Sequence, residues 1–347
     1  MINHFKTNWI LFLIFLPAIY IFLFAKNQNS NQNTYSNSKL IQIPLEGELA
    51  EPYSEISGLT WYRDQLIILP QYPDKFRVNN IGSLFKISKN DIINWLNKFN
   101  PELKLSATRI EFDTQDVSKE IKGFQGFESV LTIENKMFLT IECIQDHTTQ
   151  AYLVEGLING DIEKIVLQKE TLKLLPMPVQ VINCSYESMI VNDHELYLIY
   201  EANGKNVNKT PQAVCINLDN GEIRLKPFPN VEYRITDATA LDDKMCFWVI
   251  NYYWPGDFNF LKPANDPLLQ QTIPVLSFSR DVAIERLIEL NYSEEGFKLS
   301  GKNPILVGLG SRSYSRNWEG IVRLDNRGFI LATDKFPATI LAFLAYP

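Results

Sequence analysis

The hydrophobic and polar positions along this chain repeat one hairpin pattern five times. In each copy an acidic residue leads into a short apolar strand, a polar turn and a second apolar strand. The copies begin at Glu55, Glu128, Glu187, Asp237 and Glu319. Repeated hairpins are typical of β-propellers and related repeat folds, because each copy buries its apolar faces only against its neighbours. The pattern predicts an all-β fold.

Strand-like segments between the hairpins extend most copies to four strands. Third strands are expected at 82–88, 151–157, 212–218, 273–279 and 339–347, and fourth strands at 107–113, 162–168, 222–228 and 283–290. A short helix is expected at 90–99.

The last copy has no fourth strand of its own, and Leu40–Leu45 near the other end of the chain can supply one. Pairing of the two ends would close a propeller and remove its exposed edges. The sequence therefore predicts a five-bladed β-propeller at residues 40–347. A six-bladed propeller, with the extra blade around 304–310, is the alternative.

An apolar run near the start of the sequence predicts a membrane anchor. Trp9–Ala25 holds 17 residues without a charge, which is about the minimum for a helix that spans a bilayer. A cleaved signal segment is the alternative, but Leu23 would be too bulky at the −3 position of a cleavage site at Ala25. We therefore expect residues 1–25 to remain as a transmembrane anchor.

The polar segment 26–39 is rich in Asn and Ser and predicts a flexible linker. Anchor, linker and propeller together predict a single-pass membrane protein with its propeller outside the cytoplasm. After cleavage the protein would instead be secreted or periplasmic.

Charge and cysteine content exclude some classes of protein. The net charge is −7 and the charges are scattered, so no basic surface for nucleic acid is expected. The four cysteines are far apart and form no CxxC pair, which argues against a zinc or redox motif. They are expected to be small buried residues, and one or two disulfides are the alternative for an exported protein.

The repeated acids define a candidate metal site. The innermost strand of a propeller blade runs along the central channel, so acids that open these strands would form a ring. Such a ring requires protonation, basic partners or a bound cation, because its charges repel each other. Calcium suits many carboxylate oxygens in variable geometry. We expect a Ca²⁺ site formed by Glu55, Glu128, Glu187, Asp237 and Glu319; a solvated acidic rim is the alternative.

The return strands bring further polar residues to the same rim. These are Glu142, Glu201 and Asn251. Glu142 and Glu201 are the candidate catalytic bases, because they neighbour the ring without belonging to it. Arg234 and Arg316 each precede a ring acid by three residues, so they are expected either to neutralise the ring or to bind substrate.

Aromatic residues directly precede three of the ring acids. They are Phe127, Tyr186 and Trp318. Packing between blades is the simpler interpretation. In the alternative, Trp318 contributes to a stacking wall for a ring-bearing substrate.

Three repeats open on similar residues, Glu128-Ser-Val, Glu187-Ser-Met and Glu319-Gly-Ile. This motif resembles that of the phytase-like propellers, which include the group named for an esterase-like activity of phytase. It is also similar to the calcium-activated nucleotidase (apyrase) family. The resemblance implies a five-bladed propeller whose axial calcium is held by residues that open the inner strands. The nucleotidases use some neutral ligands there, and the GxSxG motif of many esterases is missing.

Two functions are compatible with these features. In the first, the protein is a calcium-dependent hydrolase of phosphate or ester substrates, in which calcium polarises an oxygen and a rim acid activates water. In the second, it is a non-catalytic propeller with a structural calcium that binds a small molecule or a protein at one face.

Overall fold

The computed structural model describes residues 40–272, 280–308, 315–336 and 338–346. These residues belong to one compact unit, and β-strands dominate it. The all-β prediction is therefore confirmed. The described helices are short: α2 Lys89–Lys98, α3 Val117–Glu120, α4 Phe258–Leu261 and α5 Pro267–Thr272, with 3₁₀ turns η1 Glu48–Ala50, η2 Pro73–Phe76 and η3 Pro255–Asp257.

The first large sheet has eight strands in the order β3-β4-β5-β7-β11-β10-β9-β8. Each half is an antiparallel sheet of four strands, and the parallel pair β7–β11 joins the halves edge to edge. The strands are β3 Ile56–Tyr62, β4 Gln65–Pro70, β5 Gly82–Ser88, β7 Thr108–Asp113, β8 Phe124–Ile133, β9 Lys136–Gln145, β10 Thr148–Asn159 and β11 Lys164–Leu174.

Three further sheets follow the same up-and-down order. One contains β12 Tyr186–Asn192, β13 Glu195–Tyr200, β14 Gln212–Asn217 and β15 Ile223–Pro227. The next contains β16 Arg234–Ala238, β17 Cys246–Tyr253, β18 Ile284–Ser293, β19 Gly296–Leu299 and β20 Ile305–Leu306. The last contains β21 Trp318–Leu324, β22 Gly328–Thr333, β23 Leu341–Ala345 and β1 Leu40–Ile43. A separate small pair joins β2 Leu45–Glu46 to β6 Leu105–Ser106.

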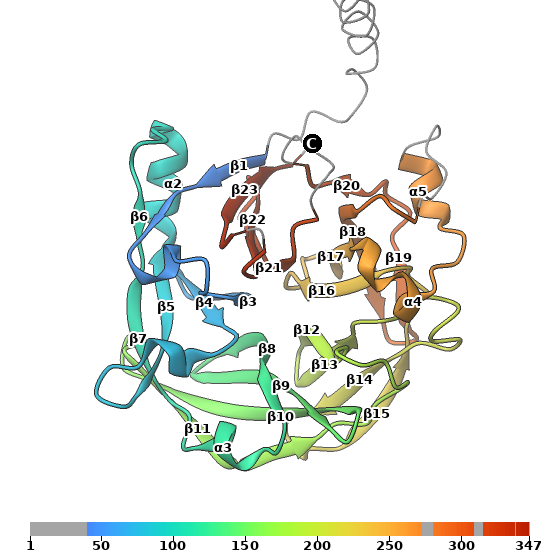
Figure 1. Ribbon diagram of the computed structural model, residues 1–347, viewed down its shortest axis with the longest axis horizontal. Coiled ribbons are helices and arrows are strands. Elements are labelled where there is room, and N and C mark those ends of the chain that lie inside the picture. The colour runs from blue at the N-terminus through green and yellow to red at the C-terminus, as the bar shows by residue number, and fades with distance from the viewer. Residues whose placement is uncertain (1–39, 273–279, 309–314, 337, 347) are drawn as a thin grey trace, which may run out of the picture. The chain divides into compact units, whose positions relative to one another are not determined.

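The first strands of the hairpins lie around a common centre (Figure 1). Strands β3, β8, β12, β16 and β21 contact one another in sequence, and β21 contacts β3 to complete the cycle. The sheets extend outward from these inner strands (Figure 1). This radial arrangement is that of a β-propeller. It brings the same part of every hairpin to the axis.

The two ends of the described chain meet in the last sheet. Strand β1 pairs antiparallel with β23, and the register places Ile43 opposite Leu341 and Leu40 opposite Leu344. The predicted pairing of residues 40–45 with the last hairpin is confirmed for Leu40–Ile43, whereas Leu45 pairs with Leu105 of β6. The pairing satisfies the backbone groups of β23 that would otherwise form an open sheet edge.

Apolar residues fill the space between neighbouring sheets. Leu131 and Phe138 of the eight-stranded sheet, for example, belong to one buried cluster with Met189 and Leu198 of the next sheet. All four cysteines are free, and Cys143, Cys184 and Cys215 are buried, as expected for small core residues.

Two expectations about the fourth hairpin change. Residues 283–290 were expected as a fourth strand, but β18 pairs directly with β17 and is the third strand of its sheet. The fourth strand is the short β19, which follows β18 through a turn. The expected third strand at 273–279 lies outside the described residues. The alternative of a sixth blade around 304–310 is also affected. The strand Ile305–Leu306 in this segment pairs with β18 and so belongs to the sheet of the fourth hairpin.

The predicted anchor at residues 1–25 and the linker at 26–39 lie outside the described residues. Within the described part of the chain, no helix has the length and apolar character needed to cross a membrane.

Candidate functional site

A β-bulge near the open end of each inner hairpin decides which side chains face the axis. In β12, Tyr186 pairs with Tyr200 and Ser188 with Ile199, so Glu187 has no partner between them. The same shift isolates Glu128 in β8 and Glu319 in β21. A bulge changes the direction of the side chain at the unpaired residue. Glu128, Glu187 and Glu319 therefore occupy equivalent positions.

The first and fourth hairpins carry hydroxyl residues at this position instead. In β3 the unpaired residue between Ile56 and Gly58 is Ser57, and its Oγ donates a hydrogen bond to the carbonyl of Phe127 at 2.6 Å. In β16 the register is lost between Ile235 and Ala238, and Thr236 donates in the same way to Trp318 at 2.5 Å. Each hydroxyl binds the carbonyl just before the bulged acid of the next hairpin.

The expected register of five equivalent acids is therefore wrong in two hairpins. Asp237 lies one residue after Thr236, and a shift of one residue along a strand sends the side chain to the opposite face. Glu55 lies two residues before Ser57, ahead of the first residue of β3, where it pairs with Lys75 and Lys335. The ring in this structure is three acids and two hydroxyl residues.

The return strands place a second set of side chains beside the bulges. Glu142 lies opposite Gly126, and Tyr252 opposite Arg234. The equivalent residues in the other hairpins donate backbone N–H groups to the opposing strand: Gln71 to Glu55 at 2.7 Å, Glu201 to Ser185 at 2.9 Å and Asp334 to Asn317 at 2.8 Å. Asn251, which was expected at the rim, lies one residue earlier than Tyr252.

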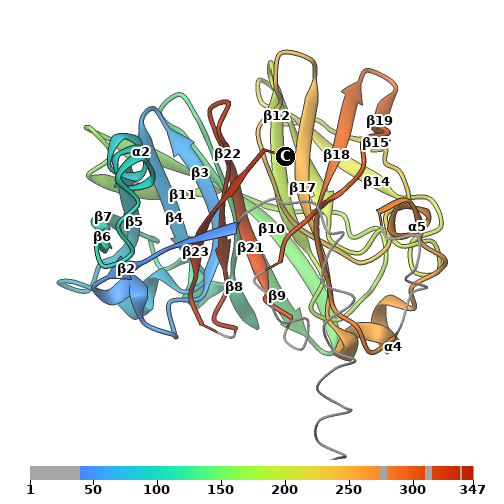
Figure 2. The same cartoon turned by 90° about the horizontal axis from the view of Figure 1, so that it is seen from above.

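The three bulged acids and the five residues of the return strands line one cavity of about 390 Å³, whereas Ser57 and Thr236 do not belong to its lining. Asp257 of its lining directly precedes α4, and α4 and the β18–β19 turn lie at opposite ends of the strands (Figure 2). The lining residues are Gln71, Tyr72, Gln125, Glu128, Glu142, Asn183, Glu187, Glu201, Arg234, Tyr252, Trp254, Asp257, Asn317, Glu319, Asp334 and Lys335. A volume of this size accommodates a small molecule.

Sequence reasoning missed several of these residues, and Asp334 is the most informative case. The last hairpin has one more residue in its turn than the hairpins that end in Glu142 and Glu201. Allowing for that residue aligns Asp334 with Glu142 and Glu201. Trp254 and Asp257 come from the long β17–β18 connection, where no repeat signal is present.

The cavity contains more acids than bases. Seven carboxylic acids line it, against the two basic side chains of Arg234 and Lys335. Arg234 forms ion pairs with Glu201 and with Asp257, the latter at 2.6 Å. Lys335 pairs with Glu55 at 2.8 Å, just outside the cavity lining.

The five remaining acids form no ion pair with any described residue. They are Glu128, Glu142, Glu187, Glu319 and Asp334. Glu128 accepts a hydrogen bond from the neutral side chain of Gln71 at 3.1 Å. The buried Oε2 of Glu187 has no hydrogen-bond partner among the described residues.

Burial makes the protonated forms of these acids more stable. Burial, followed by the negative charges of Glu128 and Glu201, raises the pKa of Glu142 to about 9. Burial also raises the pKa of Glu128 to about 7, although the hydrogen bond from Gln71 lowers it. The pKa values of Glu187 and Glu319 lie well above the usual range, mainly because of burial. The same cause raises the pKa of Asp334.

Four predicted site residues do not line the cavity. Glu55 pairs with Lys75 and Lys335; these partners lower its pKa, although burial raises it. Asp237 is buried and accepts the backbone N–H groups of Ile321 at 2.7 Å and Ala238 at 2.8 Å.

The other two, Arg316 and Trp318, bind a different acid. Arg316 pairs with Glu285 at 3.2 Å, and Trp318 donates its indole N–H to the same carboxylate at 3.1 Å. Trp318 is only 1% exposed, which fits packing between blades and leaves no free face for a substrate.

The expected calcium site fits the structure only in part. Glu128, Glu187 and Glu319 supply hard oxygen atoms, which calcium prefers. Glu55 and Asp237 already have other partners. Within the described residues, no three His, Cys, Asp or Glu side chains converge as a group that could hold a metal ion. The five predicted ligands therefore do not all face one cavity, and the calcium site stays a prediction.

Comparisons with known proteins find only distant likenesses. No family model matches the chain, and neither does any curated protein. An exo-1,5-alpha-L-arabinanase from a bovine ruminal metagenomic library is 8% identical with a TM-score of 0.46, covering 87% of this chain and 100% of that chain. A GH43_1 enzyme from Xanthomonas citri is 12% identical with a TM-score of 0.46, covering 88% and 90%.

A GH32 beta-fructofuranosidase from Bombyx mori is 10% identical with a TM-score of 0.43, covering 85% of this chain and 62% of that chain. Likenesses at this level carry no argument about the activity of this chain. The resemblance to phytase-like propellers stays a prediction.

Proposed function

We propose that this chain forms a five-bladed propeller hydrolase whose active site is the acid-lined cavity. The blade number counts the two halves of the eight-stranded sheet separately, one for each inner strand. The observation that supports a hydrolase is the pair formed by Glu128 and Glu142. These buried carboxyl groups lie on paired strands in one cavity, yet their pKa values differ, at about 7 and about 9.

The two carboxyl groups suit the two proton transfers of hydrolysis. Glu142 keeps its proton at neutral pH and can donate it to the oxygen of the leaving group. Glu128 is partly ionised at the same pH and can accept a proton from the attacking water. Acid–base pairs whose environments separate their pKa values have these roles in many enzymes. Glu201, predicted from sequence as a base, is held by Arg234 and orients that side chain.

The charge of the cavity limits the substrate. Both basic side chains are already paired with acids, so the described lining offers no unpaired basic side chain for a phosphate group. We therefore favour a carboxylic ester or another uncharged C–O bond over the phosphate substrates implied by the phytase-like resemblance.

A panel of chromogenic esters, glycosides and phosphates tests this activity. Hydrolysis should be greatest between about pH 7 and pH 9, where Glu128 is ionised and Glu142 is protonated. Glu142→Gln and Glu128→Gln should each lower kcat/KM by roughly 10²–10⁴. The exposed turn residue Glu134 provides the control, because Glu134→Gln removes a carboxylate outside the cavity. A protein that hydrolyses nothing, or whose variants all match the control, would not be this hydrolase.

The second candidate is a non-catalytic binding propeller with a structural calcium ion. The supporting observation is that Glu128, Glu187 and Glu319 come from three hairpins, so one cation between them would link three blades. Calcium would have to draw their side chains together. In either candidate, Trp9–Ala25 would attach the propeller to a membrane, with the propeller outside the cytoplasm.

A further inference from the structure

Five carboxyl groups of the cavity have no positively charged partner among the described residues. Glu187 is 8% exposed, lines the cavity, and has a buried Oε2 atom without a hydrogen-bond partner among the described residues. A buried carboxylate oxygen in this state is costly unless a donor reaches it. The most favourable donor is an N–H group that also carries positive charge.

Aromatic side chains at the same cavity favour an organic cation. Trp254 lines the cavity and is 49% exposed. Gly256 lies directly against its indole, and a Cβ atom at Gly256 would come within 2.2 Å of that ring. The absence of a side chain at Gly256 therefore lets Trp254 hold its place at the cavity. Tyr252 lines the cavity as well.

One contact of this chemical type lies beside the cavity. The ammonium group of Lys75 lies 4.4 Å from the centre of the Tyr72 ring, and it also pairs with Glu55 at 2.6 Å. An acid and an aromatic face together thus bind an ammonium group of the protein beside the lining residue Tyr72. Aromatic rings attract ammonium groups through the negative face of the ring.

The size of the cavity favours an organic cation over a metal ion. The cavity volume of about 390 Å³ lies in the range of small-molecule sites. We propose that the cavity binds an organic cation with primary ammonium groups, which donate to Glu187 while the carbon chain lies against Trp254. This inference rests on the proposed function, because it names the substrate class of that active site.

Isothermal titration of the full-length protein tests the inference with 1,4-diaminobutane. The uncharged control ligand is 1,4-butanediol, which has the same number of heavy atoms. The diamine should bind and the diol should not. Glu187→Gln should weaken diamine binding at least tenfold, equivalent to about 1.4 kcal/mol. Glu134→Gln removes an exposed carboxylate at the β8–β9 turn, outside the cavity, and should leave the affinity for the diamine unchanged.

A second variant distinguishes the loss of the binding site from unfolding of the protein. Trp254→Ala changes a half-exposed side chain, so it should fold and still weaken diamine binding about threefold or more. Equal binding of diamine and diol, no diamine binding, or equal affinity of Glu187→Gln and Glu134→Gln would each overturn the proposal. Binding of Ca²⁺ with no binding of the diamine would assign the cavity to a metal.

The hydrolase and the ligand class can fail separately. Diamine binding that persists in Glu142→Gln, in a protein that hydrolyses no substrate of the panel, would support the cation site and reject the hydrolase. If the protein hydrolyses neutral esters and the diamine neither binds to it nor inhibits this hydrolysis, the hydrolase proposal stands. The proposal that the cavity binds an organic cation is then overturned.

Discussion

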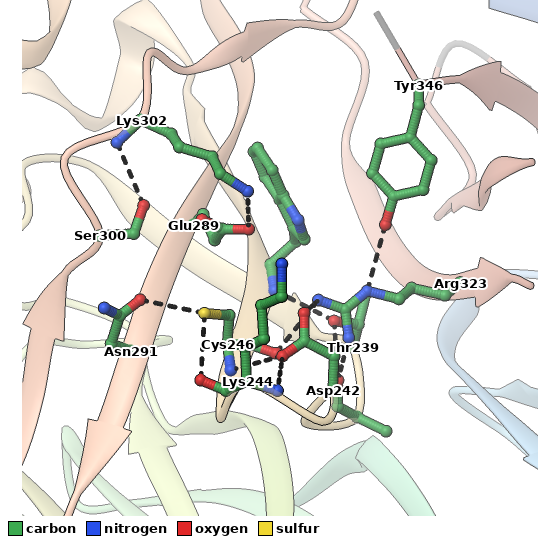
Figure 3. A network of polar contacts seen from close by, with 12 residues as sticks. Thr239, Asp242, Lys244, Cys246, Glu289, Asn291, Ser300, Lys302, Arg323 and Tyr346 are labelled. Atoms are coloured by element: carbon green, nitrogen blue, oxygen red, sulfur yellow. Dashed lines mark hydrogen bonds and ion pairs between the residues drawn. The ribbon is translucent and has the colours of Figure 1, made fainter. Parts of the chain in front are cut away.

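The two ends of the inner hairpins differ in whether their acidic side chains have basic partners. At the turn end, the acids have basic partners (Figure 3). Lys302 binds Glu289 at 2.8 Å, and Arg323 binds Asp242 at 3.3 Å. Arg323 also donates to the carbonyl of Ala240 at 2.7 Å. The contacts of Arg323 join the β16–β17 connection to β21 in the neighbouring sheet.

At the cavity end, the acids are buried and most have no basic partner. Glu142 and Glu187 are 3% and 8% exposed, and neither forms an ion pair with a described residue. The turn end therefore supports the fold, whereas the cavity end reduces its stability. Sites that break the rules of stability are expected to be functional, and the difference between the ends identifies the cavity as the place where function lies.

The largest expected effect comes from removing the one deeply paired base of the cavity. Arg234→Gln leaves Glu201 and Asp257 buried without their partner. We expect the free energy of unfolding to fall by about 3–5 kcal/mol, measured by urea denaturation. Arg323→Gln at the turn end is the matched comparison and should lower it by only about 1 kcal/mol. If Arg234→Gln and Arg323→Gln lowered the free energy of unfolding equally, the acids at the two ends would not differ in the cost of losing their basic partner.

Asp237 and Glu319, which the sequence pattern treats as equivalent, should respond differently. The two oxygens of Asp237 accept the N–H groups of Ala238 and Ile321. Asp237→Asn replaces one acceptor with a donor and should cost about 1–3 kcal/mol. Glu319→Gln should be neutral or stabilising, because it replaces a carboxyl group whose charged form is disfavoured by burial. Thermal unfolding of both variants gives the comparison, and similar losses would contradict the different registers of these two hairpins.

Stability should fall as the pH rises through the range in which the cavity acids ionise. The pKa of Glu142 is about 9 in the folded protein against an ordinary value of 4.5. Between these values the folded state binds more protons than the unfolded state. The contribution of Glu142 to the free energy of unfolding is therefore fully present below pH 4.5 and is lost as the pH approaches 9.

Glu142→Gln removes this titration. At pH 9 the variant should be more stable than the original protein by at least about 1 kcal/mol, the equivalent of less than one pKa unit. At pH 5 the two proteins should differ less. Melting temperatures at both pH values provide the measurement, with Glu134→Gln as the control. A variant that is less stable at pH 9 would show that the Glu142 carboxylate stabilises the fold.

The smallest effect is expected at the turn end. Lys298 pairs with Glu295 at the β18–β19 turn at 3.1 Å, and both side chains are exposed, at 70% and 82%. Exposed ion pairs contribute about 0.2–1 kcal/mol, so Lys298→Met should change the free energy of unfolding by less than 1 kcal/mol. A loss as large as that of Arg234→Gln would remove the distinction between the two ends.

Much of this architecture could be predicted from the sequence because its causes are local. Apolar alternation and turn residues marked the hairpins, and the unpaired last copy pointed to the strand at residues 40–45. The acids Glu128, Glu187 and Glu319 were found as equivalent, and Glu142 and Glu201 as their neighbours. Each of these features depends on a few consecutive residues and on the two-residue period of a strand.

Register and loop geometry were decided only by tertiary structure. A bulge forms where two strands pair, so the sequence of one strand did not reveal that Ser57 and Thr236 take the place of Glu55 and Asp237. One additional turn residue concealed Asp334, and a long connection carries Trp254 and Asp257 to the cavity. The sequence supplied the acids. The pairing of the strands determined which of them meet, because one residue of slip turns a side chain from the axis to the opposite face.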